Sequence, residues 1–394
     1  MKYSMLMIKK FKHLIAVLAL SSCAAKPAYD VAAFVWPAYQ DDPRWQEIGL
    51  FGDHKGEWEA IYKAEPKFEG HRQPRVPSWG YFDETSPRMQ EQIISTALEY
   101  GVNTFIFDWY WFENRPFLEG ALNDGFLKAS NNGDMKFYIM WANHTANSYW
   151  DRDEYDKSIE YWNGQVPAEV MDGFTDHLIE DYFKRPNYYR IDGKPVFCIY
   201  EISNFINGMG GMEQARAALD AFRAKAVAAG LEGIHLQAII WGSLPATLSG
   251  VPGDVEPTQD NTLRALGFDS VTNYQWCHLV PTDREYTEWG EEAIRNWENY
   301  DKDLSIPYFP HVSIDWDPNP RYPADCIQDC VKDPTPEKFE KFLRKARDYV
   351  DAHPGQVPLV TINAWNEWSE GSYLEPDEEN GYSYLEAVRN VFGK

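Results

Sequence analysis

Two glutamates near the C-terminus, Glu367 and Glu370, are three residues apart and lie beside Trp365 and Trp368. The apolar, β-branched run at residues 359–363 precedes them and is typical of a buried parallel strand. Cleavage of a glycosidic bond requires two carboxyl groups, one as acid and one as base or nucleophile. The indoles would exclude water and raise one pKa, and repulsion between the carboxylates would separate the two pKa values. We therefore predict Glu367 and Glu370 to be catalytic; two solvated glutamates in a polar loop are the alternative.

The elements that must position this pair alternate along the chain. Eight apolar stretches are predicted strands: 31–36, 103–108, 136–142, 195–200, 234–241, 270–274, 306–313 and 359–363. Strands that alternate with helices predict an α/β fold, here a single (β/α)8 barrel of the TIM type. An open, doubly wound sheet is the alternative. The length exceeds that of a minimal barrel, so we expect elaborated βα loops, chiefly at 38–86 and 315–334.

Helical patterns separate most of these strands. The segment 86–100 opens with Ser86 and Pro87, keeps apolar residues at helical spacing, and is followed by Gly101 as a stop signal. Similar patterns predict helices at 166–183, 212–229, 285–303 and 335–353.

The predicted strand ends carry polar and aromatic residues. In a parallel barrel the C-terminal strand ends form the active site. Flat rings stack on sugar faces, and amides, carboxylates and imidazoles bind hydroxyls, so this set fits a sugar better than a purely structural rim does. The predicted substrate-binding residues are Trp36, Tyr39, Asp108, Trp109, Trp141, Asn143, His144, Tyr200, Glu201, Trp241, Tyr274, Trp276, His311, Asp315, Trp316, Asn363 and Trp365. For each aromatic ring, closure of the barrel top is the alternative role, and Asp108 and Glu201 are reserve carboxylates for catalysis.

The first 22 residues have the pattern of a secretory signal, with four lysines followed by a short apolar core. Leu20-Ser21-Ser22-Cys23 resembles a bacterial lipobox, which predicts Cys23 as the lipidated first residue of the mature chain. An ordinary signal peptide is the alternative. We expect a short tether at 23–30, a catalytic domain at 31–394, and a lipid-anchored protein of the bacterial cell envelope, on the outer membrane surface or the periplasmic face.

Composition restricts the partners. The net charge is −24 and becomes more negative once the lysine-rich leader is removed, which disfavours nucleic acids and anionic lipid surfaces. We expect a glycan substrate, membrane contact only through the N-terminal lipid, no cofactor and a monomer. No zinc-type ligand pattern is present in the sequence, and Cys326 and Cys330 are spaced so that they could form a disulfide in an oxidising compartment.

One competing motif follows the seventh predicted strand. Asp315-Trp316-Asp317 resembles the metal-binding Asp-x-Asp signature of some sugar-nucleotide glycosyltransferases. A rim loop is favoured, because a three-residue pattern is common.

The segment Asn366–Gly371 resembles the glutamate motif of glycoside hydrolase family 99 and of the related WbsX-like group. Asp108-Trp109, Trp141-Ala142-Asn143, Asp315-Trp316 and Asn319-Pro320-Arg321 resemble further WbsX-like segments. The resemblance implies a (β/α)8 barrel that cleaves α-mannoside-like linkages with retention, through a 1,2-anhydro sugar. By that match Glu367 takes the proton of the substrate 2-hydroxyl, and Glu370 is the general acid and then the base.

Three hypotheses remain at this point. The first is a lipoprotein glycoside hydrolase that acts on α-linked glycans, which secretion favours because nucleotide sugars are supplied in the cytosol. The second is a WbsX-like glycosyltransferase in polysaccharide synthesis, with a metal on Asp315 and Asp317. The third is a glycan-binding lipoprotein without catalysis, which the retained glutamate pair disfavours.

Overall fold

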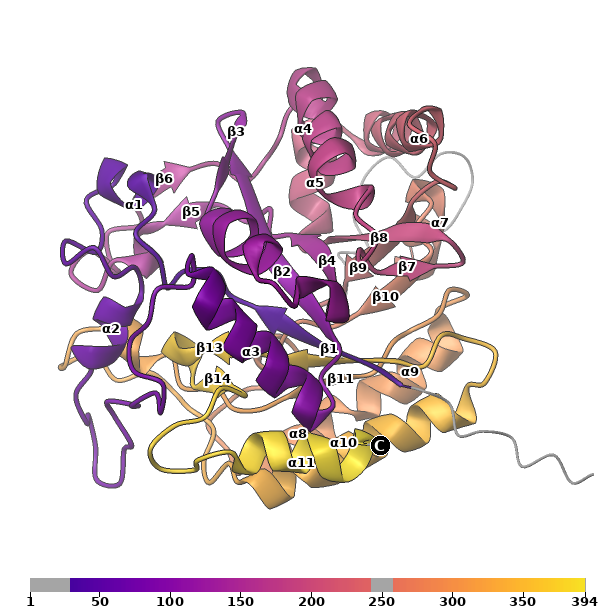
Figure 1. The fold of residues 1–394 in the computed structure, drawn as a ribbon. Helices are drawn as coiled ribbons and strands as arrows, with labels where there is room; N and C mark the ends of the chain where they lie inside the picture. The colour runs from indigo at the N-terminus through magenta and orange to yellow at the C-terminus, as the bar shows by residue number, and fades with distance from the viewer. Residues whose placement is uncertain (1–28, 242–257, 394) are drawn as a thin grey trace, which may run out of the picture.

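The computed structural model describes residues 29–241 and 258–393 (Figure 1). The predicted signal peptide, Cys23 and all of the tether before Tyr29 lie outside the described residues. No helix in the described ranges is sufficiently long and apolar to cross a membrane.

Eight parallel strands form the barrel. They are β1 (Asp30–Val35), β2 (Thr104–Phe112), β4 (Lys136–Trp141), β8 (Lys194–Ile199), β9 (His235–Ile239), β10 (Ser270–Thr272), β11 (His311–Ser313) and β12 (Leu359–Asn363). Their order in the sheet is β10-β9-β8-β4-β2-β1-β12-β11.

The two ends of this order meet. Val271 of β10 forms a parallel bridge with Tyr308, just before β11. The Val271 amide donates to the Pro307 carbonyl, and the Phe309 amide donates to the Val271 carbonyl, both at 2.9 Å. The predicted (β/α)8 barrel is thereby confirmed over the open-sheet alternative. Four strands differ by two or more residues in length from the prediction: β2 extends to Phe112, whereas β9, β10 and β11 are shorter than predicted.

The barrel helices lie outside the strands (Figure 1). They are α3 (Pro87–Tyr100), α4 (Met171–His177), α5 (Ile202–Met209), α6 (Met212–Ala228), α7 (Gln259–Leu266), α8 (Tyr286–Ala293), α9 (Arg295–Asp303), α10 (Pro336–Ala352) and α11 (Ser383–Phe392). The helix predicted at 285–303 is divided at Ile294, and α5, α7 and α11 were not predicted. Helix α3 has the predicted ends, since the Ser86 side chain accepts from the Met89 amide and Gly101 adopts φ 96°.

The long loop after β1 holds two short helices, α1 (Pro43–Glu47) and α2 (Trp58–Tyr62). Short strands complete the fold: β3 (Arg115–Phe117) extends β2, β7 (Arg190–Ile191) extends β8, β5 (Ala146–Asn147) pairs with β6 (Glu160–Trp162), and β13 (Asn366–Glu367) pairs with β14 (Ser372–Tyr373). Figure 1 shows α1 and α2 on the same side of the barrel as β13 and β14. The C-terminal end of the barrel is therefore the elaborated end, as predicted.

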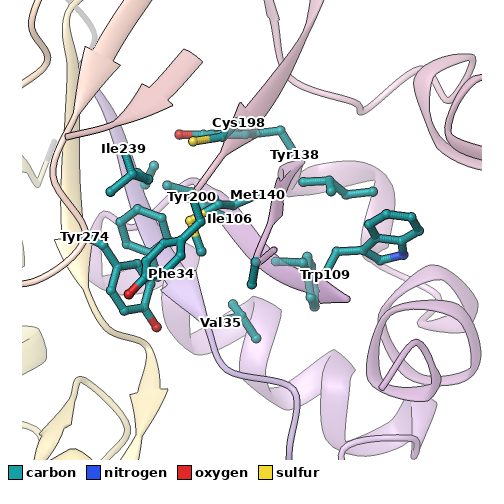
Figure 2. Packing of buried hydrophobic residues seen from close by; sticks show 14 of the residues in the cluster. Phe34, Val35, Ile106, Trp109, Tyr138, Met140, Cys198, Tyr200, Ile239 and Tyr274 are labelled. Atoms are coloured by element: carbon teal, nitrogen blue, oxygen red, sulfur yellow. The ribbon is translucent and has the colours of Figure 1, made fainter. Parts of the chain in front are cut away.

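The barrel interior is filled by side chains rather than open. Figure 2 shows Phe34, Ile106 and Ile239 converging there from three different strands. Deeper in the barrel, His311 contacts the Thr361 hydroxyl at 3.0 Å, and Thr361 contacts the Thr272 hydroxyl at 2.9 Å. These hydroxyls satisfy polar groups that water cannot reach.

The disulfide that the cysteine spacing allowed is not formed. Cys326 and Cys330 are both free thiols, and the Cys326 sulfur accepts a hydrogen bond from the Gln328 amide at 3.1 Å.

The contact between α8 and α10 provides a test of the packing. A Cβ atom at Gly290 would overlap the ring of Phe342, which is fully buried against Trp276 and Tyr286. We expect Gly290→Ala to lower the free energy of unfolding by about 1–3 kcal/mol, because overpacking a rigid core outweighs the gain in helix propensity.

Gly173 in α4 is the matched control, because it is exposed and a Cβ there meets nothing within 4 Å. Gly173→Ala should leave the stability unchanged or raise it by up to about 1 kcal/mol. Urea unfolding of both variants measures the difference, and equal midpoints would refute the packing described here.

Candidate active site

The predicted catalytic glutamates lie in a tight turn just after β12. Glu367 ends β13, Glu370 ends a short 3-10 turn (Trp368–Glu370), and Gly371 adopts φ 70° before β14. A Cβ atom on Gly371 would lie 3.2 Å from Asp315, so the turn needs glycine for its backbone and for space. Both glutamates are buried, with exposed fractions of 3% for Glu367 and 8% for Glu370.

One guanidinium serves both glutamates. Arg321 Nη1 lies 2.5 Å from Glu370 Oε1, and Nη2 lies 3.6 Å from Glu367 Oε1. Its Nε donates to Glu57 Oε1 at 2.8 Å. Arg321 is itself nearly buried, so a single cation is shared among three buried carboxylates.

Glu57 is held in place from two further sides. It precedes α2 in the loop after β1, accepts from the Trp36 indole, and accepts from the Ser369 hydroxyl at 2.8 Å. The Trp36 ring also lies 5.8 Å from the Arg321 guanidinium carbon. Trp36 therefore lies at the predicted site, where its indole contacts Glu57 and Arg321.

The two glutamates differ in how easily they hold a proton. Burial raises the pKa of Glu370 well above its ordinary value, the neighbouring Glu367 raises it further, and Arg321 opposes both effects. Burial also raises the pKa of Glu367, but Arg321, Tyr274 and Asn363 all lower it. Within the described residues Glu370 Oε2 has no hydrogen-bond partner. Glu370 is thus the better proton donor of the two.

Three more predicted residues meet at Glu367. The Tyr274 hydroxyl lies 2.7 Å from Glu367 Oε2 and 2.8 Å from Asp108 Oδ2. The Asn363 amide donates to the same Glu367 oxygen at 3.2 Å. These contacts join the middle of β2 to the ends of β10 and β12, which are far apart in the sequence.

An arc of aromatic rings continues from these strand ends. The Trp241 ring stacks on the His278 ring with their centroids 3.9 Å apart, and its centroid lies 4.7 Å from that of Tyr200. The centroid of the His144 ring lies 5.8 Å from that of Tyr200 and 5.7 Å from that of Trp150. Burial lowers the pKa of His144 to about 4 and that of His278 to about 3, so both rings are neutral at pH 7. Neutral flat rings are suited to stacking on sugars.

A cavity of about 500 Å³ adjoins Arg321 at the Trp150 end of this arc. Its wall includes Lys63, Arg152 and Asp151 and the glycine-flanked segment 49–52. This volume is in the range of small-ligand sites.

Four predicted tryptophans face away from the carboxylates. Successive residues of a strand point to opposite faces, so an inward Asp108 places Trp109 outside the barrel; Figure 2 shows the Trp109 indole pointing away from Phe34 and Tyr274. Trp109 and Trp141 pack on Phe174 of α4, Trp276 on Trp289, and Trp365 on Phe105. The geometry gives these indoles a packing role in place of the predicted contact with substrate.

Other predicted substrate-binding residues make structural contacts around the site. The Tyr39 hydroxyl accepts from the Trp368 amide at 2.9 Å. The Asn143 side chain exchanges two hydrogen bonds of 2.7 Å with the Glu201 backbone, and the Glu201 carboxylate caps α5. His311 lies deeper inside the barrel, where burial lowers its pKa well below the ordinary value. The half-buried Trp316 packs against the hydrophobic core.

Both aspartates of the Asp-x-Asp segment contact other side chains of the protein. Asp315 accepts from Arg75 at 3.2 Å, and Asp317 accepts from Gln73 at 2.7 Å and contacts His71 at 3.0 Å. In the described part of the chain, no three metal-binding side chains form a group that could hold an ion. The two aspartates do not have the open, paired arrangement of a metal-binding Asp-x-Asp motif. Their contacts with other side chains hold the loop in place instead.

Sequence reasoning did not select Arg321, Glu57 or His278 as site residues. Arg321 belongs to a segment singled out only for its resemblance, and its signal was a lone cation near an otherwise acidic set of candidates. Glu57 lies in an irregular loop and carries no comparable signal in the sequence.

Comparison with known proteins is consistent with this geometry. The family model described as Glycosyltransferase WbsX matches residues 31–388. The uncharacterized protein WxcX of Xanthomonas campestris pv. campestris is 27% identical over 376 residues, which are 92% of this chain and 49% of WxcX. The chain therefore spans about half the length of the curated relatives that it matches.

Two solved structures share the fold. A glycoside hydrolase-like protein has a TM-score of 0.59 at 16% identity, covering 93% of this chain and 95% of the other. The GH99 endo-alpha-mannosidase from Bacteroides thetaiotaomicron has a TM-score of 0.57 at 13% identity, covering 92% and 96%. These likenesses establish a shared barrel architecture.

The guanidinium shared by the three glutamates, that of Arg321, leads to a prediction about stability. Arg321→Met would leave three buried carboxylates without their cation, and we expect it to lower the free energy of unfolding by about 3–5 kcal/mol at pH 8. The loss should shrink at pH 5, because Glu367 and Glu370, whose pKa values are raised by burial, then take up protons in the folded state. Denaturant unfolding at both pH values measures this.

Arg344→Met is the matched control, since Arg344 pairs with Glu340 at a largely exposed position of α10. It should change the stability by less than about 1 kcal/mol. An Arg321→Met variant that is as stable as this control at pH 8 would contradict the role given to Arg321.

Proposed function

The chain belongs to the family described as Glycosyltransferase WbsX, and we propose that within this family it is a glycoside hydrolase that cleaves α-linked glycans. The observation that supports this most directly is the glutamate pair. Burial and the neighbouring Glu367 raise the pKa of Glu370 well above its ordinary value. Burial raises the pKa of Glu367 as well, but Arg321 and hydrogen bonds from Tyr274 and Asn363 oppose that rise. An acid and a base side by side at the C-terminal end of a barrel are what glycosidic cleavage requires.

In the proposed first step, Glu367 removes the proton of the substrate 2-hydroxyl. The freed oxygen attacks C1 while the glycosidic bond breaks, and Glu370 gives its proton to the leaving oxygen. In the second step water opens the resulting 1,2-anhydro sugar: Glu370 takes a proton from the water, and Glu367 returns its proton to O2. Each glutamate ends as it began, and two inversions at C1 give net retention.

Several features support a neutral sugar as the substrate. The aromatic arc from Trp241 to Trp150 supplies stacking surfaces, and the cavity beside Arg321 has room for a further sugar unit. The α-mannoside class is proposed by analogy with the GH99 endo-alpha-mannosidase that shares the fold. Secretion and lipid anchoring at Cys23 would place such an enzyme in the bacterial cell envelope, where polysaccharide substrates occur.

A glycosyltransferase is the second candidate, which the description of the family favours. It would need a site for a nucleotide diphosphate, commonly with a metal on an Asp-x-Asp pair. Asp315 and Asp317 instead accept hydrogen bonds from Arg75 and Gln73, which speaks against that role. A non-catalytic glycan-binding protein is less well supported, because binding alone does not need two buried carboxyl groups that differ in how readily they hold a proton.

The hydrolase proposal predicts loss of activity on removal of the acid. Purified protein is incubated with a panel of α-linked glycans, and new reducing ends are measured. We expect Glu370→Gln to lower the rate by at least about a hundredfold, the scale of a general acid. Glu386→Gln, at an exposed position of α11, should keep the parental rate.

No release by the parent protein from α-mannans and other bacterial and plant glycans would count against the hydrolase. Thermal stabilisation by nucleotide sugars with Mn²⁺ would then favour the transferase. Equal rates for the parent and Glu370→Gln would show that the glutamate pair is not the catalytic centre.

A further inference from the structure

The Tyr274 hydroxyl has more acceptors than it has protons. It lies 2.8 Å from Asp108 Oδ2 and 2.7 Å from Glu367 Oε2. A tyrosine hydroxyl donates one hydrogen bond, and an ionised carboxylate donates none. Both contacts can be hydrogen bonds only if one of the two carboxyl groups is protonated and donates to the tyrosine oxygen.

The surroundings of the two carboxyl groups decide which one holds this proton. Glu367 accepts from the Asn363 amide at 3.2 Å and has the Arg321 guanidinium at 3.6 Å, and both favour a carboxylate. Asp108 is 3% exposed, and its Oδ1 has no partner among the described residues. An ionised carboxylate buried in this way is costly, whereas the neutral acid costs far less.

We propose that Asp108 is a positioning residue that holds a proton, donating from Oδ2 to the Tyr274 oxygen so that Tyr274 donates to Glu367. The chain of hydrogen bonds therefore runs in one direction, from β2 through the end of β10 to the turn after β12. It leaves Glu367 ionised and fixes the orientation of its Oε2, which the base in the proposed hydrolysis needs. The link to catalysis rests on that proposed function; the location of the proton does not.

The groups that face Asp108 agree with this direction. They are Tyr110 on β2, Cys198 on β8, Tyr200 and Tyr274 at strand ends, and the two glutamates. They are phenols, a thiol and acids, and the cation Arg321 is engaged by the glutamates instead. Burial, followed by repulsion from Glu367, raises the pKa of Asp108 well above its ordinary value.

The first experiment locates the proton without using activity. Infrared difference spectra at pH 7 compare wild-type protein with Asp108→Asn in the carbonyl band of protonated carboxylic acids. We expect the variant to lose the band of one protonated carboxyl group. Asp348→Asn, at an exposed position of α10, should lose none. An undiminished acid band in Asp108→Asn would overturn the proposal, whether or not a substrate is known.

Tyr274→Phe provides a second spectroscopic test in case Asp108→Asn does not fold. Removing the hydroxyl takes away the acceptor of the Asp108 proton but leaves Asp108 buried. We expect the acid band to remain and to move to higher frequency, as it does when a carboxyl O–H loses its acceptor. A band that stays at its wild-type frequency would overturn the proposal.

Activity separates a positioning residue from a reacting one. An asparagine amide can donate to the Tyr274 oxygen as the protonated aspartic acid does, so Asp108→Asn should retain nearly the full rate of glycan cleavage. Asp108→Ala removes the donor, and we expect a fall of up to about a hundredfold from misplacement of the base. A loss in Asp108→Asn as large as that in Glu367→Gln would overturn the proposal. If the wild type cleaves no glycan, the proposed function fails while the infrared result still decides where the proton lies.

Discussion

The single guanidinium of Arg321 is the constraint on which the rest of the site depends. Glu57, Glu367 and Glu370 are all buried, and a buried carboxylate is unstable without a partner. Arginine suits this position because its planar fork keeps its charge when buried and reaches several acceptors at once. The residues come from the loop after β1, the loop after β11 and the turn after β12, so one cation joins three segments that would otherwise repel one another.

A second layer of buried acids orients the turn that carries the glutamate pair. Glu375 accepts from the indoles of Trp365 and Trp368 at 2.9 and 2.8 Å, and burial raises its pKa to about 8. Glu84 accepts from the Asn366 amide at 2.5 Å and from the Tyr39 amide at 3.1 Å. Trp365, Asn366 and Trp368, which lie between and beside the glutamates, thus point into the protein. The side chains directed at the strand ends are those of Glu367 and Glu370.

The division between side chains that face the site and side chains that pack behind it explains which features could be predicted from the sequence. Parallel strands buried on both faces are recognisable as apolar runs, so the barrel and the position of the glutamate pair followed from composition and spacing. Which residue of a strand end faces the site depends on register, and Asp108 and Trp109 are equally plausible until the barrel is built. Burial of a tryptophan likewise does not reveal whether its ring meets a sugar or a helix, and four indoles assigned to the site pack outside it.

Arg321 and Glu57 could not be paired by pattern, because 264 residues separate them and neither lies in a regular strand. Contacts of this kind depend on how two loops fold over the barrel end. Helices α5, α7 and α11 were missed for a simpler reason: the first two are short, and the third follows the last strand, where the alternation of strand and helix gives no further expectation.

The charge of the finished site bears on the choice between hydrolase and transferase. Even with Glu370 protonated, the carboxylates of Glu57 and Glu367 outnumber the single guanidinium of Arg321, and the chain as a whole has a net charge of −24. A nucleotide diphosphate would bring further negative charge into a buried site, where repulsion is strong unless a cation accompanies it. Asp315 and Asp317, the two acids of the Asp-x-Asp segment, are engaged by Arg75, His71 and Gln73. A neutral glycan meets no such barrier, and for that reason the electrostatics of the site favour cleavage of a sugar chain over transfer from a nucleotide donor.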